Sequence, residues 1–567
     1  MSLESNGYRT KLLSVNPIVN RRSFLGASAG AAAATLLTAR GGSSQGEATT
    51  DGTPPAEGGV RGVEIPEFDN PPSGEPSGDR PDELVIAWGA YQFTTHGIDP
   101  QLHVGTVAEA QLRHMYEPLV AFERDLQTIS PALATEWERL DDLTMQFKLR
   151  QGVTYHNGEA FNAEAVRYSI LRPLSDETPG DSRSTYSIIS DAEVVDEYTV
   201  NIKTSQPDPA LLARLTGFHM TMVAPRWASQ GPEVVAREAV GTGPYKFVSW
   251  SPNEDLVMES NEDYWGGAPA IKKVRLTTIN EQATRVAALR SGEVHLAKDM
   301  PPEELDNINS SGRARAVRAV SNRVPFYFFT TEVEPYNNVQ VRQAVNYAAN
   351  VQGVIDAVLL GNGYRVSTVL PIWTFGFDPT LEPYPHDPDR AKQLLAEAGY
   401  PDGIDVEIWY RQGRYPKDKE VAEAMCLEMA RANIRCTPQL REAALLEELQ
   451  TGKETPGLVF ASWGNWFFDA DNTFMPLFSC ETYEEYSDWR RPYVCNPEFD
   501  NVILAARVEL DVEAREELYA QAQRMFYDDA AALFMYQLVD IFGIDNWLLW
   551  EPRHDEMMWA QEMTWNE

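Results

Sequence analysis

Phe147–Leu171, FKLRQGVTYHNGEAFNAEAVRYSIL, has the pattern of a strand, a tight turn and a helix in succession. Hydrophobic and polar residues alternate over 145–150, the period of two that is typical of a half-buried strand. Asn157 and Gly158 predict the turn, because both residues tolerate a positive φ. Asn162 is placed to cap the helix that follows. The stretch predicts a structural unit that contains no catalytic group.

The same stretch resembles the signature of the family 5 solute-binding proteins of ABC importers, F-x-L-R-x-G-V-x-F/W-H-D/N-G-x-x-F-x-A-x-D/E-V. Other segments resemble further elements of that family: Gly97–Pro100, Tyr116–Val120, Pro131–Trp137, Gly241–Tyr245, Asn261–Gly267, Asn337–Val345 and Asp387–Tyr400. The resemblance extends from about Leu84 to Met535. It implies an α/β, two-lobed periplasmic-binding-protein-like fold of type II, cluster C-like, with an additional subdomain in lobe I.

The composition agrees with a large folded protein that has an acidic surface. A chain of 567 residues with 43% hydrophobic residues can build at least two lobes with cores of their own. Its 84 acidic and 48 basic residues give a net charge of -36, which repels nucleic acid and anionic lipid headgroups. We interpret this charge as a salt-adapted surface of the haloarchaeal type; an ordinary acidic secreted protein is the alternative.

The first 40 residues have the features of an export signal. Arg21 and Arg22 precede an apolar run, 24–38, which together predict a twin-arginine signal. The run is shorter than the roughly 20 residues that a membrane-spanning helix needs. Arg40 stands where a lipobox would have its lipidated cysteine, so lipidation there is excluded. Release by cleavage and retention by an uncleaved signal both remain open, as does a sequence change at this point.

The resemblance and the composition together divide the chain into consecutive parts. Two crossings between the lobes, near Thr330 and near Met535, are expected to form the hinge. The expected parts are the signal, 1–40; a disordered tether, 41–80; lobe I, 81–329, with an inserted subdomain at about 109–240; lobe II, 330–535; and a C-terminal return to lobe I, 536–567.

Aromatic residues stand beside two carboxylates in one segment, 461–471, ASWGNWFFDAD. Such a mixture can bury an apolar ligand body and fix a polar end. The segment resembles the family's G-W-x-x-D-x-x-D-P element, in which an Asp of peptide-binding members holds the α-amino group. Trp466 occupies that position and would offer a stacking wall for a sugar, an aromatic group or a cation. The candidate ligand-binding residues here are Trp463, Trp466, Phe467 and Asp469, and a purely structural role in the core is the alternative for each.

Further candidates lie in two loops. Tyr410 and Arg414 follow a predicted strand of lobe II, and Arg414 stands where peptide binders use Arg for a carboxylate. A solvated arginine is the alternative reading of Arg414. Tyr91 and His96 follow the first predicted strand and are candidates from lobe I.

The cysteines and histidines predict a disulfide but no metal site. Cys480 and Cys495 flank a polar loop, and in an exported protein a disulfide between them would add about 3 kcal/mol of stability. Cys426 is expected to be a free buried thiol. The eight histidines are isolated and lack metal-ligand spacing. Asn309 begins a glycosylation sequon.

The predicted function is the extracellular substrate-binding component of an ABC importer. It would capture a peptide-like or other small polar or amphipathic solute between the lobes and deliver it to a permease that has a separate ATPase. No catalytic residue, metal or cofactor is implied, nor is nucleic acid. The protein is expected to be an exported monomer, secreted or held at the extracellular face of the membrane through an anchor or the permease. A secreted hydrolase or peptidase is one alternative, and a ligand sensor or chaperone on the same fold is another.

Overall fold

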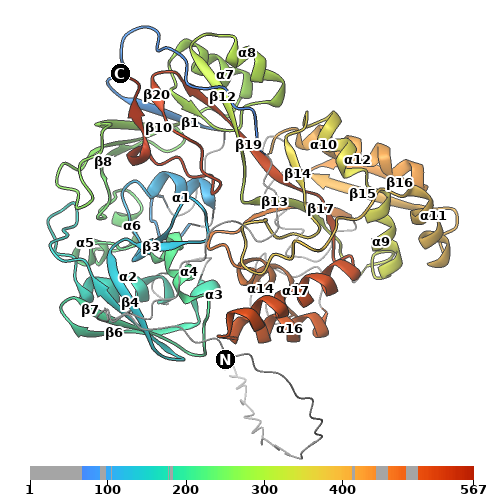
Figure 1. Cartoon of the computed structure of the whole chain (residues 1–567), viewed down its shortest axis with the longest axis horizontal. Coiled ribbons are helices and arrows are strands. Elements are labelled where there is room, and N and C mark those ends of the chain that lie inside the picture. The colour runs from blue at the N-terminus through green and yellow to red at the C-terminus, as the bar shows by residue number, and fades with distance from the viewer. Residues whose placement is uncertain are drawn as a thin grey trace, which may run out of the picture. The chain divides into compact units, whose positions relative to one another are not determined.

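Two separate β-sheets carry most of the chain (Figure 1). The computed structural model describes residues 67–89, 97–103, 105–175, 178, 183–331, 333–411, 415–441, 457–480 and 496–567. The larger sheet has eight strands in the order β12-β19-β11-β1-β10-β9-β8, with β14 paired to β19. The other has five strands in the order β16-β15-β17-β13-β18. We call the parts built on these sheets the first and the second lobe.

The larger sheet is covered on both faces, as its first strand shows. Along this strand Leu84 and Ile86 pack into the main core of the first lobe, whereas Ala87 packs into a smaller cluster with the helix residues Leu289 and Ile308. Successive side chains of a strand point to opposite faces, so both faces are buried and the strand is apolar throughout. The elements are β1 (Leu84–Trp88), β8 (Tyr245–Trp250), β9 (Asp255–Ser260), β10 (Lys273–Thr278), α7 (Gln282–Ser291), β11 (Leu296–Ala297), η3 (Pro302–Glu304), α8 (Leu305–Asn309), β12 (Ala314–Val320), β14 (Gly363–Arg365) and β19 (Tyr536–Asp545).

A four-stranded antiparallel sheet, β4-β5-β7-β6, lies within the first lobe and contains the stretch quoted above. In β5 Phe147 is buried and Lys148 is exposed, as the alternation predicts. Gly158 has a φ of 84°, and the side chain of Asn162 accepts a hydrogen bond from the backbone N–H of Ala165 at 3.1 Å. The predicted strand, turn and cap are therefore confirmed.

The remaining elements of the first lobe surround that sheet and its connection to the larger one. They are α1 (Thr106–Leu112), β2 (Val120–Phe122), β3 (Ile129–Pro131), β4 (Ala134–Asp141), β5 (Thr144–Leu149), α2 (Ala163–Leu171), η1 (Arg172–Leu174), α3 (Arg183–Tyr186), β6 (Ile189–Asp196), β7 (Thr199–Thr204), α4 (Leu211–Thr216), η2 (Phe218–Met220), α5 (Pro225–Ala228), α6 (Pro232–Val235), β20 (Leu548–Leu549), η5 (Ala560–Glu562) and β21 (Thr564–Trp565).

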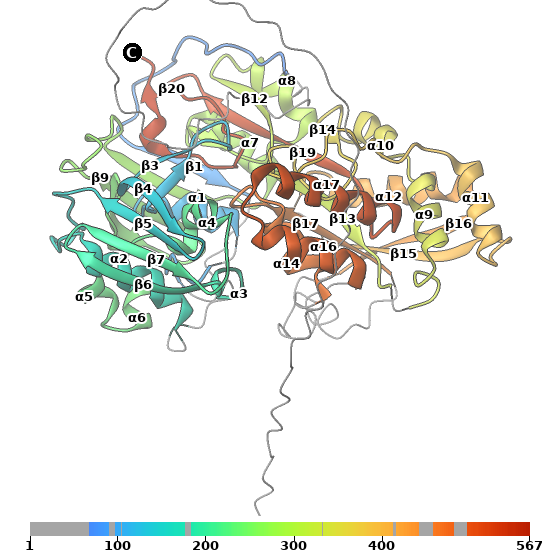
Figure 2. The same ribbon diagram turned by 60° about the horizontal axis from the view of Figure 1, so that its bottom comes forward.

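Helices cover both faces of the five-stranded sheet in the second lobe. Tyr327 points into the core formed with α9 to α12, whereas Phe326 and Phe328 point into the core formed with α14, α16 and α17, which Figure 2 shows at the front. The helices predicted over 337–345 and from Asp387 are present and capped by Asn338 and Asp387. The elements are β13 (Arg323–Phe328), α9 (Val339–Ala348), α10 (Val351–Ala357), α11 (Pro388–Glu397), β15 (Ile404–Tyr410), α12 (Asp418–Met429), η4 (Ala430–Ala432), β16 (Ile434–Leu440), β17 (Leu458–Gly464), α14 (Asp471–Phe478), α16 (Pro497–Val508), α17 (Val512–Asp528) and β18 (Ala532–Phe534).

Apart from β14, which lies between β13 and β15 in the sequence but pairs with β19 of the larger sheet, the chain passes between the sheets at two points. The first is Ser321 and Asn322, between β12 of the larger sheet and β13 of the smaller one. The second is Met535, between β18 and β19. The first crossing thus precedes the position expected near Thr330, because the apolar strand before Thr330 already pairs within the second lobe. The second lies where the sequence placed it.

The last part of the expected tether is packed on the first lobe. Phe68 lies under the guanidinium of Arg318 at 4.8 Å, and the side chain of Asn70 exchanges two hydrogen bonds with the backbone of Arg318 in β12. Ordered structure therefore begins earlier than residue 81, which the sequence did not suggest because this segment is rich in Pro, Gly and Ser.

The cysteine pairing differs from the expectation for Cys426. This residue is joined by a disulfide to Cys436, ten residues later, so the prediction of a free thiol is wrong. Helix α12 carries Cys426 and strand β16 carries Cys436, and the chain turns back between them through η4. Cys480 is disulfide-bonded, and Cys495 lies outside the described residues.

No helix of the described part of the chain is long and apolar enough to cross a membrane. The predicted export signal lies outside that part. Asn309 is exposed, its side-chain oxygen accepts a hydrogen bond from Ala316 N at 2.7 Å, and its glycosylation stays a prediction.

Candidate functional site

A small cavity, with about 30 Å³ of space for the centres of water-sized molecules, lies between the two lobes. Its walls come from six separate parts of the chain: helix α1, strand β2, the end of α4, the first crossing, the loop after β17 and the C-terminal segment after β20. The lining residues are Thr106, Glu109, Arg113, Ala121, Phe122, Thr216, Asn322, Trp466, Phe468, Asp555, Met557 and Trp559.

Aromatic rings form much of the wall. Phe122 of the first lobe meets Phe468 of the second edge to face, with ring centroids 5.0 Å apart. Trp466 packs against Trp463 at 5.1 Å and faces His219 of the first lobe at 6.1 Å. Because these rings come from both lobes, they give the cavity an apolar surface only when the lobes are together.

The charged groups of the cavity are buried. Glu109 is 6% exposed, and its Oε1 accepts hydrogen bonds from Arg113 Nε and Nη2 at 3.1 and 2.8 Å. Burial raises the pKa of the Glu109 carboxyl above its usual range; Arg113 opposes this rise, whereas the nearby carboxylates of Asp555 and Glu556 add to it. Asp555 is held by Arg553, which donates from Nη2 to Oδ2 at 2.8 Å.

Several polar atoms of the lining residues have no hydrogen-bond partner within the described structure. They are the indole Nε1 of Trp466, the indole Nε1 of Trp559 and the Oδ1 of Asn322. Buried polar atoms are nearly always paired in folded proteins, so these three atoms are available to water or to a ligand in the cavity.

The four candidates of the 461–471 segment lie together, but only Trp466 lines the cavity. Trp463 is buried behind it and donates from Nε1 to the Asn472 carbonyl at 2.8 Å. Phe467 is fully buried, with the guanidinium of Arg214 at 4.9 Å from its ring. Tyr410 packs into the helical core of the second lobe.

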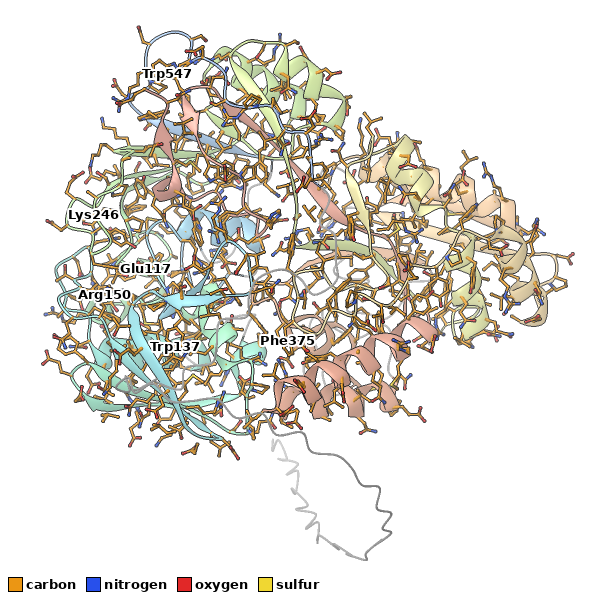
Figure 3. All side chains as sticks on the ribbon, in the orientation of Figure 1. Glu117, Trp137, Arg150, Lys246, Phe375 and Trp547 are labelled. Carbon is orange, nitrogen blue, oxygen red and sulfur yellow. A yellow bond between two sulfur atoms is a disulfide. The ribbon has the colours of Figure 1, made fainter. Side chains whose placement is uncertain are left out.

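Asp469 is engaged by an arginine of its own lobe. Arg515 donates to both of its carboxylate oxygens, at 2.7 and 2.8 Å, and lies 4.7 Å from the ring centroid of Phe375, a residue labelled in Figure 3. Asp469 thus holds the loop that carries Trp466, and a direct role in ligand binding stays a prediction. Arg414, Tyr91 and His96 lie outside the described residues.

A buried ionic network joins the lobes beside the cavity. Arg214 of α4 pairs with Asp208 in its own lobe, at 2.9 Å, and with Asp471 of the second lobe. Both Arg214 and Asp471 are almost completely buried. Burial alone would raise the pKa of Asp471, but Arg214 and Arg507 hold it below its usual range. The network stabilises the arrangement in which the lobes enclose the cavity.

Glu117, another buried carboxyl, is structural and does not line the cavity. It accepts hydrogen bonds from Tyr264 and Thr242, both at 2.7 Å, and from the indole of Trp265. Arg150 stacks on that indole, 3.9 Å from its centroid, in the same lobe as Glu117 (Figure 3). Burial raises the pKa of Glu117 to about 7, against the opposing effect of these hydrogen bonds and of Arg150. Glu117 joins three segments that the resemblance singled out.

Sequence reasoning missed Glu109, Asn322 and Trp559. Glu109 is the acidic residue of the short helix TVAEAQL, which is a weak signal in the sequence, and only the structure shows that all seven residues of this helix are buried. Asn322 and Trp559 belong to no pattern, because the fold alone brings them to the cavity. No group of three or more His, Cys, Asp or Glu residues in the described part could hold a metal ion.

Comparison with known proteins agrees with this architecture. Residues 128–485 match the family described as bacterial extracellular solute-binding proteins, family 5. The chain belongs to this family. The match includes the quoted stretch, the first crossing and the segment that carries Trp466.

Its relatives bind different solutes. The chain is 29% identical to heme-binding protein A of Haemophilus influenzae over 462 residues, 76% of this chain and 84% of the relative. It is 27% identical to the dipeptide-binding protein of Escherichia coli over 470 residues, 77% of this chain and 86% of the relative.

A solved structure with the same architecture is that of the periplasmic binding protein DppA from Helicobacter pylori with the peptide STSA. It has a TM-score of 0.75 and 25% identity, and covers 86% of this chain and 98% of that one. This family-5 protein therefore has the two-lobed periplasmic-binding fold and is a substrate-binding component of an ABC importer.

Proposed function

We propose that this protein closes its two lobes on a peptide-like or other small amphipathic solute in the cavity between Glu109 and Trp466. The observation that carries the proposal is the lining of that cavity, to which both lobes contribute aromatic rings and buried polar groups. A ligand that contacts both lobes stabilises the closed state, and a permease can distinguish that state from the open one.

The side chains that line the cavity indicate the class of ligand that it could bind. Phe122, Phe468 and Trp466 suit an apolar body, whereas Glu109 and Arg113 suit polar groups. Relatives named for dipeptide, glutathione and heme all bind solutes that combine polar groups with a larger body. Trp466 stands where peptide-binding members have the Asp that holds the α-amino group of a peptide. This difference supports a mode of ligand recognition that does not use that ion pair.

The N-terminal part supports a proposal about localisation. A twin-arginine signal over residues 1–40 would export the folded protein, and Arg40 excludes a lipid anchor at that position. We propose an exported monomer whose acidic surface is adapted to high salt and which meets its permease, with a separate ATPase, at the outer face of the membrane. The net charge of -36 supports the adaptation to salt.

The test is a thermal-shift screen of the purified full chain in molar salt against di- and oligopeptides, oligosaccharides, heme and cationic metabolites. A ligand at about 100 times its Kd adds roughly 2.7 kcal/mol of stability and raises Tm. Small-angle scattering should show that the same ligand makes the protein more compact. A screen without any hit would contradict the proposal, and turnover of a compound would support the hydrolase alternative.

A further inference from the structure

Residues 67–80, which we call the strap, run along the edge of the larger sheet. The edge strand there is β12. The side chain of Asn70 accepts a hydrogen bond from Arg318 N at 2.8 Å and donates one to the Arg318 carbonyl at 2.9 Å. Arg315 of the same strand donates to Ser73 Oγ at 3.0 Å. An edge strand leaves backbone groups unpaired, so the strap takes over part of the hydrogen bonding that a further strand would supply.

The strap also holds the C-terminal segment of the chain. The backbone N–H of Gly74 donates to Asn546 Oδ1 at 3.2 Å, and the carbonyl of Gly74 accepts from Asn566 Nδ2 at 3.3 Å. Between these two asparagines the chain passes through residues 555–559, three of which line the cavity. The strap therefore braces both ends of the segment that forms one wall of the cavity.

Phe68, near the start of the strap, packs against a hydrophobic cluster that the two lobes share. Val320 of this cluster ends β12 in the first lobe, and Val324 lies in β13 of the second lobe, so the cluster includes residues on both sides of the first crossing. Phe468 of the second lobe belongs to the same cluster and lines the cavity. A movement of the second lobe about this crossing must therefore change the packing beside Phe68.

We infer that the strap controls the hinge: it fixes Phe68 to the first lobe, where the ring stabilises the state in which the lobes are together. None of the described residues that line the cavity belongs to the strap, so the strap affects the cavity through the first crossing and the C-terminal segment. This effect is present without a solute, and the inference goes beyond the proposed function. It gives a conformational role to a segment whose composition is typical of a passive tether.

The variant Phe68→Ala in the full chain tests the inference without any ligand. Small-angle scattering should give a larger radius of gyration than for the wild type. The amide of Ser321 donates to the Leu538 carbonyl at 2.9 Å and reports on the first crossing. Its hydrogen exchange should be about fivefold faster or more, because exchange follows the free energy of local opening. Phe247→Ala removes another partly buried phenylalanine, in β8 at the opposite edge of the same sheet, and should change neither quantity.

Two further variants separate the attachment of the strap from the packing of Phe68. Asn70→Ala releases the strap from β12 and should reproduce both effects of Phe68→Ala. Ser77→Ala is the control within the strap, because Arg313 contacts only the backbone carbonyl of Ser77, at 3.2 Å, and the variant keeps that carbonyl.

Unchanged scattering and exchange in both Phe68→Ala and Asn70→Ala would overturn the inference, as would equal changes in Phe247→Ala. These measurements are independent of the solute screen. If the screen yields no ligand but Phe68→Ala and Asn70→Ala loosen the first crossing, the proposed function fails and the inference stands. If ligands bind and neither variant differs from the wild type, the inference fails and the proposed function stands.

Discussion

The guanidinium of Arg214 in the first lobe donates a hydrogen bond to the carboxylate of Asp471 in the second lobe, and both side chains are almost completely buried. This pair can exist only while the lobes are together. A charge that loses its partner in such a place costs several kcal/mol, so the pair couples closure of the lobes to the ionic network beside the cavity.

Asp471→Asn should weaken closure, because it leaves Arg214 with Asp208 alone. We expect a larger radius of gyration and at least a tenfold loss of affinity for any ligand of the cavity, since the binding-competent fraction falls. Asp378→Asn is the matched control: this residue pairs with Arg524 within the second lobe and should change neither quantity. Unchanged scattering and affinity in Asp471→Asn would mean that the pair does not control closure.

Trp466→Ala should weaken ligand binding by at least about 1 kcal/mol, as expected for an aromatic residue at the centre of a site. Trp547→Ala removes another partly buried tryptophan, at the edge of the first lobe (Figure 3), and should leave the affinity unchanged. Calorimetry with the best ligand of the screen measures both. Equal losses in the two variants would show that Trp466 has no particular role.

The disulfide between Cys426 and Cys436 should stabilise the second lobe. A loop of ten residues corresponds to roughly 3 kcal/mol in the chain-entropy description. The double variant Cys426→Ser, Cys436→Ser should therefore unfold at lower urea concentration than the wild type. Peptide mapping without reductant should recover the linked peptides, and free thiols at both positions would refute the pairing.

Acid should destabilise the protein through its buried neutral histidines. His295 accepts a hydrogen bond from Val85 N at 3.0 Å through Nδ1, and burial, assisted by Arg313, lowers its pKa to about 4. His114 accepts from Ala560 N at 3.1 Å, and burial lowers its pKa to about 4 as well. The unfolded chain binds these protons from about pH 6.5, so their contribution is complete above that pH and is lost as the pH falls to 4.

The variant His295→Asn keeps an acceptor that does not titrate. Its free energy of unfolding, measured by urea titration, should fall less steeply between pH 6.5 and 4 than that of the wild type. The two slopes should differ by up to about 1.4 kcal/mol per pH unit. Parallel curves for the two proteins would show that His295 is protonated equally in both states.

Local patterns made much of the fold predictable. The cap at Asn162 and the buried strand with Phe147 depend on neighbours a few residues away, and the helix from Asp387 carries its own start signal. The first crossing could not be placed from the sequence, because β12 and β13 follow each other closely, are both almost fully buried, and only their pairing assigns them to different sheets. Cys426 was misjudged for the same reason: its partner is fixed by how β16 returns along α12.

The cavity was only partly predictable. Trp466 lies in a contiguous segment rich in aromatic and acidic residues, and that composition is visible. Glu109 and Trp559 are 450 positions apart in the sequence and meet only in the folded chain. Asp469 has the composition expected of a ligand-binding residue, but its carboxylate is bound by Arg515, which no local pattern reveals.

Strand β19 determines when the first lobe can finish folding during translation. It lies between β12 and β11 and all ten of its residues are buried, although it begins at Tyr536, after the whole second lobe. The larger sheet therefore stays open while the ribosome translates the second lobe, and the lobes cannot mature one after the other. A product truncated before Tyr536 lacks both the strand that completes the first lobe and the Trp559 wall of the cavity, so only a chain translated to its end can capture its solute.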